Sequence, residues 1–262
     1  MRKDCWIQSA NIQRELEAFF SEVDDDLSSY YEEHPNTSET HLDGMLIGLL
    51  TSKSFDRYAQ RINAERERSG LRPISLKIKG TPITSKERTH GADIGIVARL
   101  NIPGEHELTK AALVQSKRLH PNLFSFSDDC VYPELFKERR EGDTPPQWER
   151  MLGITSSSFY FLYNPERVRI KRTNRTIKTR VITAQTIAGM VNRRRAFTVQ
   201  DAAKAKTFAS WMVEEFICCN VGDPRDDVIA TALGQNQEFS VRHSIEVTME
   251  SGEIRQESFS RQ

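Results

Sequence analysis

The chain has 262 residues, enough for one substantial α/β domain, and its equal counts of 37 basic and 37 acidic residues favour no class of partner by net charge. Its cysteines, at 5, 130, 218 and 219, lack both a disulfide framework and the C-x-x-C spacing of a zinc site. We therefore expect Cys218 and Cys219 to be buried thiols in a reduced, cytoplasmic protein. No apolar run approaches the ~20 residues of a membrane span, so no membrane association is expected.

Helices are predicted for the first part of the chain. Apolar residues recur at helical spacing over residues 10–23, and a polar, acidic break is expected over 24–35. A second helix is expected to begin at a cap near Asn36 and to run to Leu50. A third helix is expected to pass through Tyr58 and to end near Gly70.

Strands are predicted next, at residues 74–78, 92–100 and 111–118, with a hairpin-like connection between the last two. A short helix over 145–152 and an apolar strand over 158–163 follow. Further on, the pattern predicts a helix around 208–216 and a final strand over 239–249 that extends the main sheet or covers it.

These elements define an α/β protein with three expected parts. Residues 1–35 form an N-terminal helix and acidic segment, and residues 36–165 form the core. Residues 166–262 supply a basic segment, then a helix and a strand that pack on the core.

The charge is unevenly distributed. The segment between Arg14 and Glu39 is predominantly acidic, whereas the stretch from Arg167 to Arg195 holds ten basic residues and no acidic one. Such a stretch is either a solvated face or a surface that tracks phosphates. In the second case the candidate nucleic-acid-binding residues are Arg169, Lys171, Arg172, Arg175, Lys178 and Arg180.

Three polar groups are candidates for chemistry. Asp93 lies at the start of a buried strand, where a lone carboxylate is costly, and Gly95 leaves space beside it. Gln115 and Lys117 are two residues apart on an apolar strand, so their side chains share one face about 6.6 Å apart. Glu39 lies three residues before Leu42 and should point to the buried side of its helix.

Each candidate also has a structural alternative. Glu39 fits a capping box with Asn36 as readily as it fits a ligand. Asp93 could instead pair with Arg99 or Lys117, and Gln115 with Lys117 could belong to a solvated edge strand. His90 lies near the predicted site, but a lone histidine is more often structural than catalytic.

The pattern Asp93 … Gln115-x-Lys117, with a glutamate on the preceding helix, resembles the PD-(D/E)xK nuclease superfamily, in particular its Mrr-like variant with Q-x-K. Ala92, not proline, precedes the aspartate, and Gln115 replaces an acid. The resemblance covers about residues 36–163 and implies a restriction-endonuclease-like core of helix, three-strand meander, helix and strand. It implies Asp93, Gln115 and Glu39 as metal ligands and Lys117 as the catalytic lysine.

The resemblance implies a DNA endonuclease that uses Mg²⁺ or Mn²⁺ and leaves 5′-phosphate ends. It also suggests the effector of a prokaryotic restriction or anti-phage defence system. No separate specificity domain is recognisable, so a regulatory or specificity partner protein or a homo-oligomer is expected to control it, and the acidic segment 22–33 could shield the basic face. The alternatives are a catalytically inert restriction-like fold that binds nucleic acid or assembles a complex, and a scaffold for protein contacts.

Overall fold

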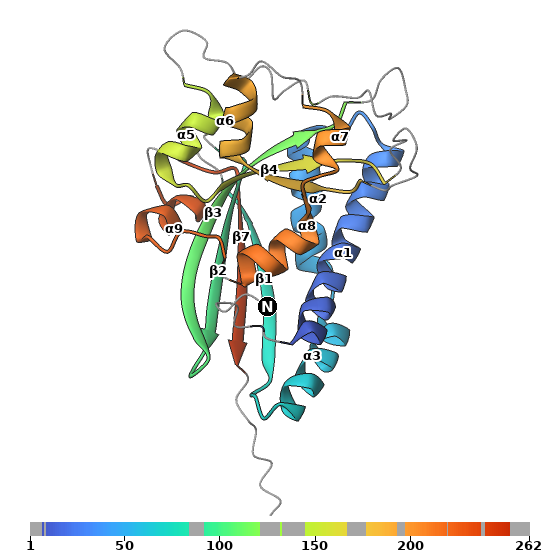
Figure 1. Ribbon diagram of the computed structural model, residues 1–262, viewed down its shortest axis with the longest axis vertical. Helices are drawn as coiled ribbons and strands as arrows, with labels where there is room; N and C mark the ends of the chain where they lie inside the picture. Colours follow the sequence, from blue (N-terminus) through green and yellow to red (C-terminus); the bar gives the residue numbers. More distant parts are fainter. Residues whose placement is uncertain are drawn as a thin grey trace, which may run out of the picture.

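A computed structural model describes residues 7, 9–83, 92–120, 132, 145–166, 177–192, 197–218, 220–236 and 239–251. The protein is a mixed α/β protein in which N-terminal helices precede a seven-stranded sheet with interspersed helices (Figure 1). The strands are β1 (Ile74–Pro82), β2 (Ile94–Ile102), β3 (His106–Arg118), β4 (Ser158–Tyr163), β5 (Arg180–Thr183), β6 (Lys206–Thr207) and β7 (His243–Ser251).

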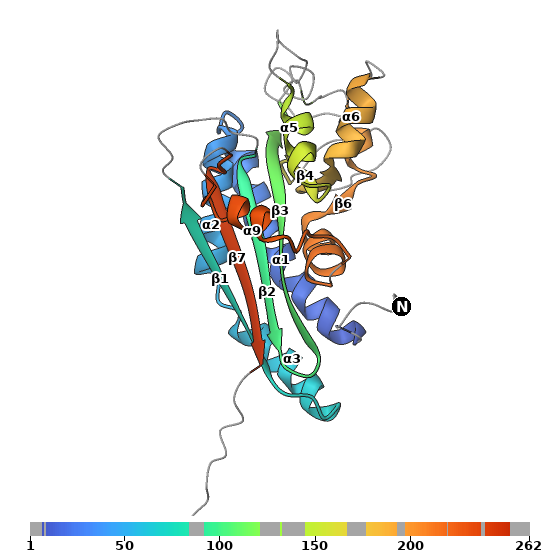
Figure 2. The same cartoon turned by 90° about the vertical axis from the view of Figure 1, so that its left-hand side faces the viewer.

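The C-terminal strand β7 lies inside the sheet. The spatial order is β1-β7-β2-β3-β4-β5-β6, with β7 antiparallel to β1 and parallel to β2 (Figure 2). The expected three-strand meander is therefore wrong, because β7 separates β1 from β2. The expected hairpin is confirmed: β2 and β3 pair antiparallel and turn at Gly104, whose φ is +81°. β3 and β4 are parallel, with a helix in the connection between them.

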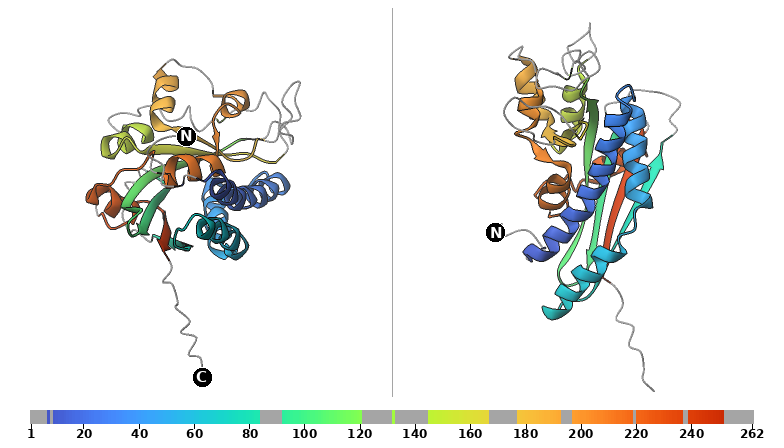
Figure 3. Two further views of the ribbon diagram at one scale, coloured as in Figure 1. Left: turned by 60° about the horizontal axis from the view of Figure 1, so that its bottom comes forward. Right: turned by 90° about the vertical axis from the view of Figure 1, so that its right-hand side faces the viewer.

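Helices cover both faces of the sheet (Figure 3). One face packs against α1 (Ala10–Glu33), α2 (Glu39–Ser52), α3 (Asp56–Arg68), α8 (Phe208–Ser210) and the π-helix η1 (Trp211–Ile217). The other face packs against α5 (Gln147–Ile154), α6 (Ala184–Asn192), α7 (Val199–Ala202) and α9 (Asp226–Ala232). No helix in these described ranges is long and apolar enough to cross a membrane.

The first helix continues through the acidic segment that the sequence suggested as a break. Leu27 and Tyr31 extend its buried apolar stripe beyond Val23, and tertiary packing of that stripe stabilises the helix. Asp24 is also buried, and its carboxylate accepts a hydrogen bond from the Thr179 backbone N–H at 3.1 Å. The acidic segment up to Glu33 therefore belongs to α1, and its buried residues pack into the core.

Replacing Asp24 with asparagine is expected to remove a pH dependence of stability. Burial raises the pKa of Asp24 from 3.8 to about 6, despite hydrogen bonds from Thr179. Between these values the native state binds more protons than the unfolded state, so the free energy of unfolding falls as the pH rises through about 6. Urea unfolding at pH 5 and pH 7 measures this difference. Between these pH values the free energy of unfolding of the native chain should fall by about 1 kcal/mol more than that of Asp24→Asn. Parallel pH profiles would contradict this assignment.

Cys218 is buried as expected, but it is not a free thiol. Its side chain is 1% exposed and takes part in a disulfide. The other cysteines of the chain lie outside the described residues. The expectation of a reduced Cys218 is wrong for this structure.

Candidate functional site

The candidate site lies at the end of the β2–β3 pair where the hydrogen-bonded pairing of the two strands stops. The last residue pair of their ladder at this end is Ile94 with Val114, so β3 continues beyond β2 as far as Arg118. Two backbone N–H groups of this extension donate to carboxylates: Ser116 N to Asp93 Oδ2 at 3.0 Å, and Arg118 N to Glu39 Oε1 at 3.1 Å. The two carboxylates are therefore placed along one strand edge.

Asp93 is held by its backbone as well as its side chain. Its N–H donates to Val114 O at 2.9 Å, and its carbonyl accepts from the N–H groups of Arg242 and His243, each at 3.0 Å. The residue is 4% exposed, and Oδ2 also accepts a hydrogen bond from Gln115 Nε2. These contacts fix the carboxylate beside β3.

Gln115 and Lys117 lie on the face of β3 that packs against α5 and α9. Their neighbours at alternate positions, Ala111 and Leu113, belong to the core cluster of that face. Lys117 is 6% exposed, and its ammonium donates to Gln147 Oε1 on the first residue of α5, at 3.3 Å. Gln115 is 3% exposed, and its buried Oε1 has no hydrogen-bond partner among the described residues. An unpaired buried carbonyl is energetically costly.

Glu39 is the first residue of α2 and does not form the proposed capping box. The N-cap is Ser38, whose side chain accepts a hydrogen bond from His41 N, so the cap reading based on Asn36 is wrong. The carboxylate instead binds Arg118 N, two residues along β3 from the amide that Asp93 binds. Amides at this spacing are about 6.6 Å apart, so Glu39 and Asp93 are neighbours along the edge.

Asp43, which the sequence analysis did not select, is a third carboxyl group of this region. It is one turn beyond Glu39 on α2, is fully buried, and accepts a hydrogen bond from the Tyr163 hydroxyl at 2.7 Å. Burial raises its pKa well above 3.8, and the negative charges of Asp93 and Glu39 raise it further. Burial and the charge of Asp43 likewise raise the pKa of Tyr163. The four-residue spacing from Glu39 was the sequence signal that could have identified Asp43.

Arg242 is a second residue that the sequence did not indicate. It precedes β7, and its Nη1 is 3.4 Å from Asp93 Oδ1 and 2.9 Å from Thr40 Oγ1 on α2. The alternative partner proposed for Asp93, Arg99, forms an ion pair with Glu246 at 3.1 Å instead. Arg242 thus brings a cation from the last strand to the carboxylate of Asp93.

The space expected beside Gly95 is filled by α9. A Cβ atom at Gly95 would lie 2.0 Å from the Ala232 carbonyl oxygen. Glycine at this position therefore permits close packing of a helix on the sheet, and the expectation of open space is wrong.

Residues of the predicted phosphate-binding segment divide into two groups. Lys178 forms an ion pair with Asp25, and Arg180 Nη1 donates to Ala205 O at 3.1 Å. Burial lowers the pKa of Arg180. His90 and the remaining candidates lie outside the described residues; those candidates are Arg169, Lys171, Arg172 and Arg175.

The carboxylates and the amide form a mixed donor set. The described part of the chain contains no group of three or more His, Cys, Asp or Glu side chains arranged to hold a metal ion. Asp93 and Gln115 are the adjacent oxygen donors, whereas Glu39 reaches the strand edge from α2, on the opposite face of the sheet from Gln115 and Lys117. Comparison with protein-family models, curated proteins and solved structures found no match to this chain.

Proposed function

We propose that the protein is a metal-dependent nuclease that hydrolyses phosphodiester bonds of DNA, with a restriction-endonuclease-like core. The observation that carries the proposal is the contact of Asp93 with Gln115 where the pairing of β2 and β3 ends, with buried Lys117 two residues further along the same face of β3. A carboxylate, an amide oxygen and an ammonium group are the side chains needed to hold a hard cation and to stabilise a phosphate that gains negative charge.

The donor set fits Mg²⁺ or Mn²⁺. Both are hard cations that prefer oxygen ligands, and the unpaired Oε1 of buried Gln115 is an oxygen beside the Asp93 carboxylate. Asp93 and Gln115 would hold the ion, with Glu39 as a further ligand. A bound divalent cation polarises a phosphate and lowers the pKa of a bound water.

Lys117 supplies the positive charge of the proposed site. Its side chain leaves β3 on the same face as Gln115, and Gln147 at the start of α5 orients its ammonium group. In a buried setting an oriented ammonium is a strong donor to the developing negative charge of a phosphate. It would bind the scissile phosphate and orient the attacking water.

The arrangement of elements supports the proposed core. Along the chain, a helix precedes the β2–β3 hairpin, and α5 and a strand parallel to β3 come after it. This order follows the one implied by the resemblance, with β7 as an additional strand. The same resemblance favours a role in prokaryotic restriction or anti-phage defence. We propose that a regulatory or specificity partner, or a homo-oligomer, restrains the activity.

One observation favours the inert binding module as a second candidate. The carboxylate of Asp93 already has protein partners on both oxygens: Gln115 and Ser116 on Oδ2, and Arg242 on Oδ1. An inert restriction-like fold could use these interactions only to stabilise the sheet edge. It would bind DNA without a metal requirement.

The test is cleavage of plasmid and linear DNA with Mg²⁺ or Mn²⁺, with EDTA as a control. We expect cleavage by the native chain, loss of cleavage in EDTA, and a fall of about 100-fold or more in Asp93→Asn. Asp24→Asn is the matched control, because Asp24 is also a buried aspartate but contacts Thr179 instead of β3. Equal cleavage by native chain and Asp93→Asn would exclude the proposed site, and metal-independent DNA binding without cleavage would favour the inert module.

A further inference from the structure

Arg242 has hydrogen-bond donors that the fold does not use. Its side chain is 40% exposed, and its contacts involve Nη1 alone: Thr40 Oγ1 accepts at 2.9 Å, and Asp93 Oδ1 lies 3.4 Å away. Its Nε and Nη2 atoms have no hydrogen-bond partner among the described residues. A guanidinium group with unused donors and an exposed side chain is suited to bind an oxyanion.

A structural arginine of the same chain is bonded differently. Arg66 is 1% exposed, and its Nε and Nη2 atoms each donate to an oxygen atom at 2.6 Å. The contact of Arg242 with Asp93 is longer, and its side chain is far more exposed. The carboxylate of Asp93 is also held on Oδ2 by Ser116 N and Gln115 Nε2, so Arg242 is not needed to fix it.

The carboxyl groups around Arg242 oppose the approach of a phosphate. Asp43, Asp93 and Glu39 are close enough for their charges to interact, and a DNA phosphate adds another negative charge. Lys117 is 6% exposed and lies on the face of the sheet that packs against α5. Arg242 instead reaches α2 on the opposite face and is the more exposed of these two cations. An approaching phosphate would therefore meet Arg242 first.

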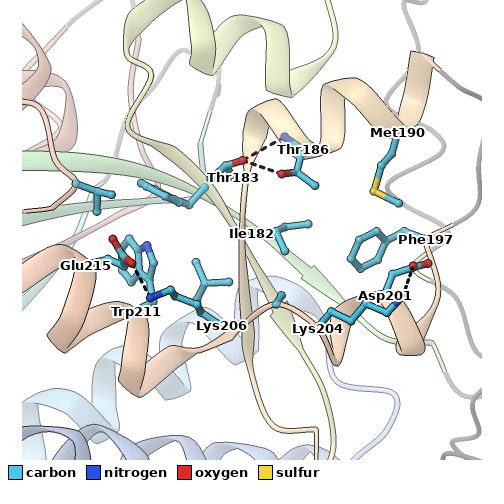
Figure 4. Close-up of a pocket in the computed structure, with 14 residues that line it drawn as sticks. Ile182, Thr183, Thr186, Met190, Phe197, Asp201, Lys204, Lys206, Trp211 and Glu215 are labelled. Atoms are coloured by element: carbon cyan, nitrogen blue, oxygen red, sulfur yellow. Dashed lines mark hydrogen bonds and ion pairs between the residues drawn. The ribbon is translucent and has the colours of Figure 1, made fainter. Parts of the chain in front are cut away.

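The lysines of a separate cavity do not supply a cation to this site. The cavity has a volume of about 630 Å³ and lies around β5 and β6 (Figure 4). In its lining, Lys206 forms an ion pair with Glu215 at 2.5 Å, and Lys204 lies 3.9 Å from Asp201. The cavity shares no lining residue with the site around Asp93, so its paired lysines are not ligands for a phosphate there.

We propose that Arg242 binds a phosphate of the DNA backbone, and that it exchanges its contact with Asp93 for this phosphate when a divalent cation binds at Asp93. The inference rests on the proposed function and adds a substrate-binding residue to it. A divalent cation at Asp93 repels the guanidinium, whereas a phosphate offers it a bidentate, charge-assisted partner. The backbone N–H of Arg242 donates to Asp93 O at 3.0 Å, so the exchange requires movement of the side chain only.

The test compares two affinities of the full chain with those of Arg242→Gln. Electron paramagnetic resonance of free Mn²⁺ measures metal binding without DNA, and fluorescence anisotropy of a labelled DNA duplex measures DNA binding with Ca²⁺ in place of Mg²⁺. We expect Arg242→Gln to bind Mn²⁺ about tenfold more tightly, because a competing positive charge is removed. It should bind the duplex about tenfold more weakly, because a phosphate contact is lost. A general loss of structure would weaken both affinities.

Arg99→Gln is the matched control. The Arg99 side chain is 41% exposed and forms an ion pair with Glu246 at 3.1 Å further along β2, so the variant removes the same charge away from Asp93. Both of its affinities should stay within about twofold of the native values. The inference is overturned if Arg242→Gln binds Mn²⁺ no more tightly, or the duplex no more weakly, than Arg99→Gln does. If the native chain and Arg242→Gln both fail to bind Mn²⁺, or both fail to bind the duplex, the proposed function itself is contradicted.

Discussion

The Lys117→Ala variant is expected to cleave DNA about 10² to 10⁴ times more slowly than the native chain while its DNA affinity stays nearly the same. The ammonium of Lys117 is buried on the face of β3 that carries Gln115 and is oriented by Gln147. Its main contribution should therefore be made to the transition state, where the phosphate carries additional charge, and not to the bound substrate. Single-turnover cleavage with saturating Mg²⁺ measures the rate, and binding with Ca²⁺ in place of Mg²⁺ measures the affinity.

The chain contains a matched control on the same strand. Lys110 is also a buried lysine of β3, but its ammonium donates to Val221 O at 2.6 Å and lies 5.0 Å from the centre of the Phe216 ring. Lys110→Met should lower the free energy of unfolding by about 1–3 kcal/mol and leave the cleavage rate per folded molecule unchanged. If both variants lose activity in proportion to their loss of folded protein, Lys117 has a structural role only.

The agreement between sequence and structure at this site has a simple geometric cause. Residues of a strand alternate between faces, so Gln115 and Lys117 had to share one. The short connection after β2 produced an antiparallel hairpin, and the residues just beyond its final pair, Asp93 and Gln115, became neighbours. Both relations are local in sequence, which is why a single sequence suffices to predict them.

The remaining parts of the site depend on contacts that are distant in sequence. Asp43 faces Tyr163 across 120 residues, and Arg242 reaches Asp93 from the start of β7. β7 shows the same difficulty, because its alternating pattern fits an edge strand and an inserted strand equally well. Its place between β1 and β2 is set by pairing with both, which no local pattern reveals.

Gly95→Ala is expected to destabilise the fold by about 3 kcal/mol or more. The added Cβ would lie 2.0 Å from the Ala232 carbonyl oxygen and 2.5 Å from Ala232 Cα, so the backbone of α9 would have to move away from β2. Gly48→Ala is the matched control, because a Cβ there meets nothing within 4 Å and alanine favours the helix by up to ~1 kcal/mol. In urea unfolding, the free energy of unfolding should therefore be lower than that of the native chain for Gly95→Ala and higher for Gly48→Ala. Equal stability of the two variants would contradict the close packing of α9. Since Gly95 is two residues from Asp93, the displacement should also lower cleavage per folded molecule, which links the packing of α9 to the proposed metal ligand.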